Sequence, residues 1–282
     1  MSERLRLPAP AKLNLMLHIT GRRDDGYHLL ETVFQFIDLC DQLEFRVTDQ
    51  TDILRLSSHT PVAAADDIVL ATASLLQSRY AVKQGINIAI DKSIPIGGGL
   101  GGGSSNAATC LLALNQLWNL RLSLEQLAEI ALELGADVPV FVRGTAAWAT
   151  GIGEELRPLE LAQPYYLVID PKIEVSTAQI FGAQELTRNS DPLTIRAFLR
   201  GSGTNACEPV VRNMYPQVGA AIDWLSQYAP ARMSGTGACV FAACDSLEQA
   251  EQVKSRVPEK WDAFVAKGLN SSPLHQQLGL LD

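Results

Sequence analysis

The sequence has 282 residues, of which 47% are hydrophobic and 19% are charged, and its formal net charge is −8. This length is sufficient for two domains, and the composition is that of a folded globular protein, which excludes an intrinsically disordered chain. The acidic balance argues against a protein whose main task is to bind a nucleic-acid backbone, but it leaves room for a local basic pocket that binds a phosphorylated small molecule.

Three features of the sequence lead us to expect a cytoplasmic protein. The five cysteines are odd in number and contain no Cys-x-x-Cys pair, which is typical of free thiols in a reducing compartment. Residues 1–8 lack the apolar segment of a signal peptide. No apolar run reaches the ~18 residues that a membrane-spanning helix needs. We expect no membrane segment, and neither the cysteines nor the four histidines suggest a metal site.

Alternation of apolar and polar residues predicts the strands in the first part of the chain. Helical spacing predicts a helix over residues 68–80 and a second helix after a run of glycines, which Ser104 or Ser105 is placed to cap. The predicted strands cover residues 13–19, 32–39, 43–47 and 86–90.

A further helix is predicted to begin at the capping box over residues 123–126 and to end at Gly135. Pro139 follows shortly afterwards, and we expect it to prevent the helix from resuming. The chain then becomes loop-like around residues 156–164, which predicts a boundary between domains 1–160 and 161–282.

The second half of the chain predicts the order β-α-β-β-α-β, which is the ferredoxin-like pattern. Its two middle strands are joined by a tight glycine-containing turn over residues 234–237. The strands are predicted over 165–169, 231–233 and 263–266 and in a segment that ends at residue 243, and the helices over 218–227 and 246–256.

The most informative segment is a glycine-rich loop, in which six of the seven residues from Gly97 to Gly103 are glycine. Ordering so many glycines costs backbone entropy, so the run indicates a use for N–H groups that a ligand can approach closely. A strand, a glycine loop and a helix N-terminus together form an anion site. Because the loop is flanked tightly by a strand and a helix, a flexible linker is a poorer interpretation.

The loop is not a Walker A motif, because no lysine precedes Ser104. The spacing of Gly97, Gly99 and Gly102 satisfies the dinucleotide-binding fingerprint, which also requires an acidic residue at a strand end about 20 residues further on. Here the candidate, Glu125, lies at a predicted helix start. A dinucleotide-binding oxidoreductase or a non-catalytic nucleotide binder therefore stays open as an alternative.

Three segments together resemble the GHMP kinases, a family of ATP-dependent small-molecule kinases. The loop over 95–105 resembles the ATP loop of that family, Pro10–Leu15 its N-terminal strand motif and Met233–Phe241 its C-terminal glycine motif. The resemblance implies an α+β fold with two domains, the first like ribosomal protein S5 domain 2 and the second ferredoxin-like. ATP and substrate would meet in the cleft between the domains.

Shorter segments resemble one branch of that family, whose substrate carries a cytidine diphosphate group. They are Gly26–His28, Gly135–Phe141 and Ala266–Gly268, and the resemblance extends from Pro8 to Leu274. It implies ATP with Mg²⁺, a small-molecule substrate, no nucleic-acid or membrane partner, and a monomer or weak homodimer. The alternative within the family is a kinase that acts on homoserine, mevalonate or a sugar.

The resemblance assigns the catalytic roles to Lys12 and Asp137. Without it, a lysine in a strand usually lies on a solvated face, and an aspartate after a helix-ending glycine is usually a turn residue. The resemblance makes Asp137 the base for the acceptor hydroxyl and places Lys12 beside it, where its charge would stabilise the transferring phosphoryl group. Asn14 lies on the same strand face as Lys12 and is expected to contact substrate hydroxyls.

The remaining site residues also follow from the resemblance. Tyr27 and His28 are expected to recognise the cytosine, with Phe181 on the other side of the base and Thr177 near the substrate. No metal ligand is assigned. At the adenine pocket the chain has Asp66-Asp67-Ile68, where the family often has Asn-Leu. The expected ATP-binding residues are Lys92, Pro95, Ile96, Gly97, Gly98, Gly99, Leu100, Gly101, Gly102, Gly103, Ser104 and Ser105.

Overall fold

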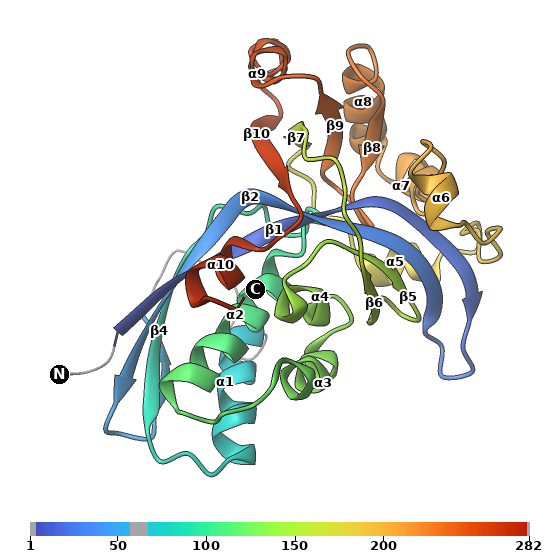
Figure 1. Cartoon of the computed structure of the whole chain (residues 1–282). Coiled ribbons are helices and arrows are strands. Elements are labelled where there is room, and N and C mark those ends of the chain that lie inside the picture. Colours follow the sequence, from blue (N-terminus) through green and yellow to red (C-terminus); the bar gives the residue numbers. More distant parts are fainter. Residues whose placement is uncertain (1–3, 57–66, 281–282) are drawn as a thin grey trace.

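Two long antiparallel strands, β1 (Arg4–Arg22) and β2 (His28–Thr48), run across the molecule (Figure 1). The computed structural model describes residues 4–56 and 67–280. Both strands are longer than predicted, and the segments predicted as two strands over 32–39 and 43–47 form one. The pairing register shifts between Pro10 and Ala11 of β1, so the alternation of side chains is interrupted inside β2 without ending the strand.

The described strands form a ten-stranded sheet with the central order β3-β4-β2-β10-β7-β9-β8, while β1, β5 and β6 pair off this path. β10 (Asp262–Leu269) joins the two halves of the molecule, because it pairs with β2 at one end and with β7 (Tyr165–Asp170) along the rest of its length. The other strands are β3 (Ile53–Arg55), β4 (Gly85–Asp91), β5 (Ala147–Thr150), β6 (Glu155–Pro158), β8 (Ala231–Met233) and β9 (Val240–Cys244).

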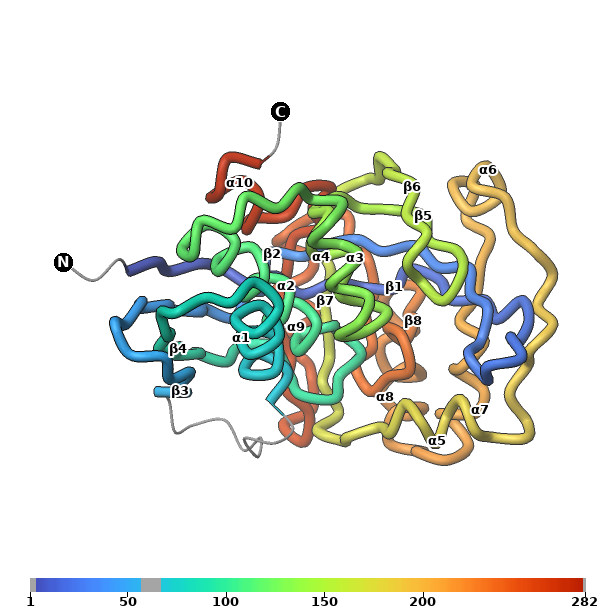
Figure 2. Tube along the Cα trace, turned by 90° about the horizontal axis from the view of Figure 1, so that it is seen from below, coloured from blue at the N-terminus to red at the C-terminus, as the bar shows by residue number. Residues whose placement is uncertain are grey.

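The helices of the first half of the chain gather on one side of β1 and β2 (Figures 1 and 2). A continuous apolar core joins them to β2 and β4. The predicted capping box is confirmed, since the Ser123 hydroxyl accepts a hydrogen bond from the Gln126 N–H and the Gln126 side chain accepts one from the Ser123 N–H. The helices are α1 (Ile68–Arg79), α2 (Gly102–Leu117), α3 (Leu124–Leu134) and α4 (Val138–Arg143).

The second half of the chain has its own core on the other side of the long strands, and the predicted β-α-β-β-α-β order is confirmed. Leu17 and Ile19, from the far end of β1, also belong to this core. No helix among the described residues is long and apolar enough to cross a lipid bilayer. The helices here are α5 (Thr177–Gly182), α6 (Ile195–Phe198), α7 (Glu208–Met214), α8 (Pro216–Leu225) and α9 (Leu247–Lys254).

Two local predictions are wrong. The helix after the glycine loop begins at Gly102 and its N-cap is Gly101, in the left-handed conformation, so neither Ser104 nor Ser105 caps it. Pro139 does not keep the chain from being helical, because it lies in the first turn of α4. At that position the N–H that proline lacks would have no partner within the helix. Asp137 is consequently the N-cap residue of α4.

The last described helix, α10 (Pro273–Leu278), returns to the first half of the molecule. Leu274 is fully buried in the core that contains β2 and α2, and α10 packs against β1. The described C-terminal segment thus packs with the N-terminal half, while the division into 1–160 and 161–282 stays a prediction.

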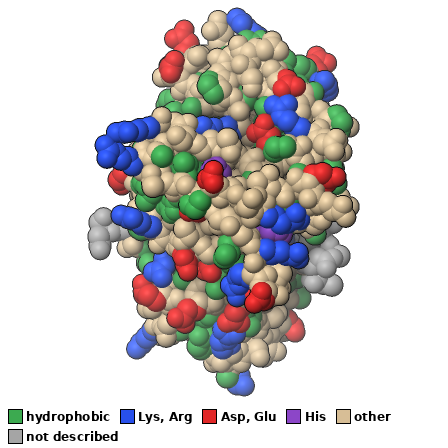
Figure 3. Space-filling view, turned by 90° about the vertical axis from the view of Figure 1, so that its right-hand side faces the viewer, with side chains coloured by type: hydrophobic (Ala, Val, Ile, Leu, Met, Phe, Trp, Pro, Cys, Tyr) green, Lys and Arg blue, Asp and Glu red, His purple; other side chains and the backbone are tan. Residues whose placement is uncertain are grey.

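Charged side chains of both signs are interspersed on the face that carries the β1–β2 hairpin and α6 (Figure 3). Hydrophobic side chains form small, separate patches on the same face. This face therefore lacks the extended basic surface that is typical of proteins that bind nucleic acid.

The buried His275 predicts a pH dependence of stability. Its Nε2 lies 3.3 Å from the Phe141 carbonyl oxygen of α4, and burial lowers the pKa of the imidazole. The unfolded state therefore takes up the proton first. The stability that neutral His275 supports is complete above pH ~6.5 and is lost as the pH falls below that value.

We expect the wild type to be more stable than His275→Gln near neutral pH, and this advantage to shrink toward about pH 5.5 because only the wild type loses the neutral imidazole there. Urea denaturation of both proteins across this range measures the difference in the free energy of unfolding. A difference independent of pH would contradict the assignment.

Candidate functional site

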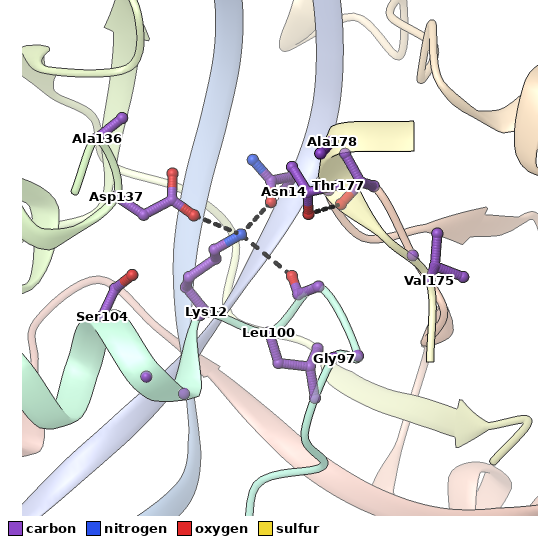
Figure 4. Close-up of a pocket in the computed structure, with 18 of the residues that line it drawn as sticks. Lys12, Asn14, Gly97, Leu100, Ser104, Ala136, Asp137, Val175, Thr177 and Ala178 are labelled. Carbon is purple, nitrogen blue, oxygen red and sulfur yellow. Dashed lines mark hydrogen bonds and ion pairs between the residues drawn. The ribbon is translucent and has the colours of Figure 1, made fainter. Parts of the chain in front are cut away.

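A large pocket with a volume of about 1040 Å³ collects residues from both halves of the chain. It is lined by β1, by the glycine loop, by the N-cap of α4 and by α5. All the site residues predicted from the sequence line it except Ser105, which is fully buried and whose hydroxyl has no hydrogen-bond partner among the described residues. Segments far apart in the sequence thus meet at one cavity (Figure 4).

The ammonium group of Lys12 is the central charge of the pocket (Figure 4). Lys12 is only 2% exposed. Its Nζ donates to the Asn14 side-chain oxygen and to the Gly99 carbonyl oxygen at 3.1 Å, and it lies 3.3 Å from Asp137 Oδ2. A charge removed from water requires such partners. The predicted proximity of Lys12, Asn14 and Asp137 is confirmed, whereas their chemical roles stay predictions.

Ser234 belongs to the C-terminal glycine motif that the sequence analysis named, and it connects the C-terminal turn to this group. Its hydroxyl accepts from the Asn14 N–H at 3.1 Å and donates to the Gly99 carbonyl oxygen at 2.8 Å. Ser234 is fully buried. The Gly99 carbonyl therefore receives hydrogen bonds from β1 and from the C-terminal half of the chain, and these fix the glycine loop from two sides.

The glycines of the loop serve two different purposes. Gly99 and Gly101 have positive φ angles of 72° and 73°. A Cβ atom at Gly101 would lie 2.8 Å from the Phe141 ring and 3.0 Å from the Lys12 side chain, and one at Gly99 would collide with the Ser234 carbonyl. Gly103 differs, because a Cβ there would meet nothing within 4 Å. The first two glycines are needed by the fold, and Gly103 leaves open space at the start of α2.

A second buried ion pair holds the strand end that leads into the loop. Asp41 is fully buried in β2, forms an ion pair with Lys92 and accepts from the Ser93 and Ile94 N–H groups at 2.8 and 2.9 Å. A Cβ atom at Gly102 would lie 3.3 Å from Lys92 Nζ, so this charge faces the N-terminus of α2. The sequence reasoning missed Asp41, although an aspartate within an apolar strand was a usable signal.

The adenine contacts expected near Asp67 stay a prediction. Asp66 lies outside the described residues. Asp67 caps α1 by accepting from the Val69 N–H at 2.9 Å, and its other oxygen lies 2.5 Å from Arg55 Nη1. Asn106 also lines the pocket, and its buried side-chain oxygen has no hydrogen-bond partner among the described residues. A buried acceptor without a partner suits a ligand that donates a hydrogen bond there. The sequence analysis did not identify Asn106 as a site residue.

The far end of the pocket is aromatic. The rings of His28 and Phe181 stack with their centroids 5.0 Å apart, while Tyr27 is 58% exposed at the rim. The prediction that Phe181 lies on the other side of the base from Tyr27 and His28 stays a prediction, and the structure adds that the rings of His28 and Phe181 are in contact. The Thr177 hydroxyl lies 2.9 Å from the Thr236 hydroxyl, which belongs to the C-terminal turn.

Comparison with known proteins identifies the family. The family model of the GHMP kinases N terminal domain matches residues 67–145, and that of the GHMP kinases C terminal matches residues 183–263. The 4-diphosphocytidyl-2-C-methyl-D-erythritol kinase of Nitrosococcus oceani is 57% identical over 95% of each chain. The chain belongs to the GHMP kinase family, in the group of 4-diphosphocytidyl-2-C-methyl-D-erythritol kinases. This membership rules out the dinucleotide-binding alternative.

Further comparisons agree with this membership. The kinase of the same name from Chromohalobacter salexigens is 50% identical and covers 99% of this chain and 96% of its own. A crystal structure of 4-(cytidine 5'-diphospho)-2C-methyl-D-erythritol kinase matches with a TM-score of 0.82 at 29% identity, over 94% of this chain and 99% of that one. A mevalonate kinase structure matches with a TM-score of 0.72 at 15% identity, which shows the fold alone. The predicted α+β GHMP kinase fold is confirmed.

The two kinds of loop glycine yield a sharp test of phosphate binding in this kinase. Gly103→Ala adds a methyl group where the protein leaves space, so we expect an unchanged or slightly raised melting temperature, because alanine favours a helix over glycine by ~1 kcal/mol. We expect the KM for ATP to rise by about 10-fold, because the methyl group obstructs the approach of a phosphate to the backbone.

Gly101→Ala is the matched variant, and it should lower the melting temperature because of its positive φ and its contact with Phe141. Steady-state kinetics and thermal melts of both variants measure these effects. A Gly103→Ala protein with normal ATP kinetics would show that phosphate does not approach the loop at this point.

Proposed function

We propose that this chain transfers a phosphoryl group from ATP to the 2-hydroxyl of 4-diphosphocytidyl-2-C-methyl-D-erythritol, giving the 2-phosphate and ADP. This reaction belongs to the non-mevalonate, methylerythritol phosphate route to isoprenoid precursors. The observation that carries the proposal is the buried Lys12–Asp137 pair beside a glycine loop, in a pocket whose other end is lined by Tyr27, His28 and Phe181. The names of the relatives support the same substrate.

Asp137 is the general base of the proposed reaction. As the N-cap residue of α4 it makes no capping hydrogen bond with its side chain, and that side chain is 38% exposed. One carboxylate oxygen faces Lys12, so the other is available to accept the proton of the acceptor hydroxyl. Lys12, held in a buried position, stabilises the negative charge that develops on the transferring group.

The phosphate end of the pocket fits ATP. ATP, bound with Mg²⁺, supplies the phosphoryl group. The chain provides N–H groups of the glycine loop, the N-terminus of α2 and the charge of Lys92 for the phosphates. No group of three or more His, Cys, Asp or Glu residues within the described ranges is arranged to hold a metal ion, so we propose no protein ligand for Mg²⁺.

The substrate lies on the other side of Lys12. Asn14 is held between Lys12 and the Thr32 hydroxyl, which leaves one amide hydrogen for a substrate hydroxyl. Thr177 borders the path to the cytosine end, where Tyr27, His28 and Phe181 bind the base. We further propose a cytoplasmic enzyme that works as a monomer or weak homodimer without a nucleic-acid partner.

A panel of acceptors tests the function. The purified protein is incubated with ATP, Mg²⁺ and, separately, 4-diphosphocytidyl-2-C-methyl-D-erythritol, homoserine, mevalonate and galactose, and ADP formation is followed. We expect kcat/KM for the cytidyl substrate to exceed that for every other acceptor by at least about 10³-fold, because only this substrate fills the aromatic end of the pocket. Equal or better turnover of homoserine or mevalonate would overturn the proposal and favour another GHMP kinase.

A further inference from the structure

Arg188 lies behind the aromatic end of the pocket and uses four of its five N–H groups. Its Nε donates to His28 Nε2 at 3.1 Å. Its Nη2 donates to the carbonyl oxygens of Phe181 and Ala183 at 2.9 and 2.7 Å, and its Nη1 donates to that of Leu186 at 3.1 Å. One planar group therefore holds both the ring of His28 and the backbone of the segment that carries Phe181.

The bond from Arg188 to His28 has only one possible direction. A guanidinium has no acceptor, so His28 Nε2 must accept, and the neutral ring then carries its proton on Nδ1. Burial, together with the positive charges of Arg188 and Arg22, lowers the pKa of His28, which keeps the ring neutral near pH 7. The ring of His28 therefore offers an Nδ1–H donor.

A pyrimidine with an acceptor at N3 suits this donor. Cytosine has a lone pair at N3, whereas uracil has an N–H group there, so an Nδ1–H donor pairs with cytosine and meets another donor in uracil. The opposite tautomer of His28 would present an Nδ1 acceptor and would favour uracil instead. The choice between the two bases thus depends on which nitrogen of His28 carries the proton.

We propose that Arg188 is a positioning residue that determines base specificity by holding His28 in the Nδ1–H tautomer against the pyrimidine edge. This inference rests on the proposed function, because it takes the cytidine diphosphate group as the ligand of this end of the pocket. Within the described ranges, the hydrogen bonds of Arg188 reach the site through His28 and the backbone around Phe181, so it acts on the base through these groups.

The kinetic test compares substrates that carry cytosine or uracil and are otherwise identical. Arg188→Met removes the donors and keeps an unbranched side chain. We expect the preference for the cytidyl over the uridyl substrate, as a ratio of kcat/KM, to fall by about 10-fold, with the KM for ATP little changed. Mere loosening of the Phe181 segment would weaken both substrates equally and leave the ratio unchanged, which would overturn the proposal.

Arg22→Met is the matched control. Arg22 also places a positive charge near His28, but its Nε donates to the Gly26 carbonyl oxygen, not to the ring. This variant removes a charge without removing the hydrogen bond to the imidazole. We expect its preference for cytidine over uridine to remain that of the wild type, whatever happens to the individual KM values. A loss of preference equal to that of Arg188→Met would show that charge, and not the bond to His28, sets the specificity.

A spectroscopic test does not depend on the substrate. Imidazole ¹⁵N–¹H correlation spectra of the full chain, with His28 assigned from the spectrum of a His28→Asn protein, report the tautomer. We expect a protonated Nδ1 and an accepting Nε2 in the wild type and in Arg22→Met, and the other tautomer or a mixture in Arg188→Met. An Nε2–H ring in the wild type would overturn the inference.

The two tests separate this inference from the proposed function. If the cytidyl substrate is not phosphorylated but the tautomer depends on Arg188, the proposed substrate fails and Arg188 still sets the state of His28. If the substrate is phosphorylated and neither the ratio nor the tautomer responds to Arg188→Met, the inference alone fails.

Discussion

A buried ammonium group without acceptors is unstable, and the site is organised by this constraint on Lys12. Its three oxygen partners come from β1, from the glycine loop and from the N-cap of α4. Removing any one of these partners leaves the buried charge of Lys12 less well compensated. For a buried ion pair, the loss of one partner costs several kcal/mol of stability. The fold therefore cannot bury Lys12 without also bringing the loop and Asp137 to the same point.

The second half of the chain also holds the glycine loop in place, through hydrogen bonds from its C-terminal turn. Ser234 adds a hydrogen bond to the Gly99 carbonyl, and the N–H groups of Ala238 and Cys239 donate to the Gly97 and Gly98 carbonyls at 3.2 and 3.0 Å. The carbonyl side of the loop is thereby tied to the C-terminal turn. We propose that its N–H groups bind the phosphates, which is the polarity that an anion requires.

The parts of the site that the sequence predicted are those with a local signature. The glycine loop stands between a strand and a helix, and both neighbours show clear periodicity. The helix that Asp137 caps was not predicted, because the effect of Pro139 depends on where the helix begins. Proline is compatible with the first turn of a helix and destabilises its later turns. The continuity of β2 was not predicted, because the register shift opposite Pro10 and Ala11 interrupts the alternation of apolar and polar side chains.

The partners of the site residues could not be predicted, because they are separated in the sequence by distances that no local pattern spans. Asp41 contacts Lys92, Ser234 contacts Gly99 and Arg188 contacts His28 only in the folded chain. The resemblance to a family supplied Lys12 and Asp137, whose residue types alone favoured ordinary surface positions. It also placed Phe181 across the base from Tyr27 and His28, which stays a prediction, and the contact between the rings of His28 and Phe181 is what the structure adds.

The most direct test of the account is a double-mutant cycle on the turnover of Lys12→Met and Asp137→Asn, with urea denaturation of each protein to show that it is folded. Since the two groups act as one unit, each single variant should lower kcat by about 10²-fold or more, and the double variant should be little worse than the poorer single one. Two effects that multiply would contradict the account, because they would mean that Lys12 and Asp137 act independently.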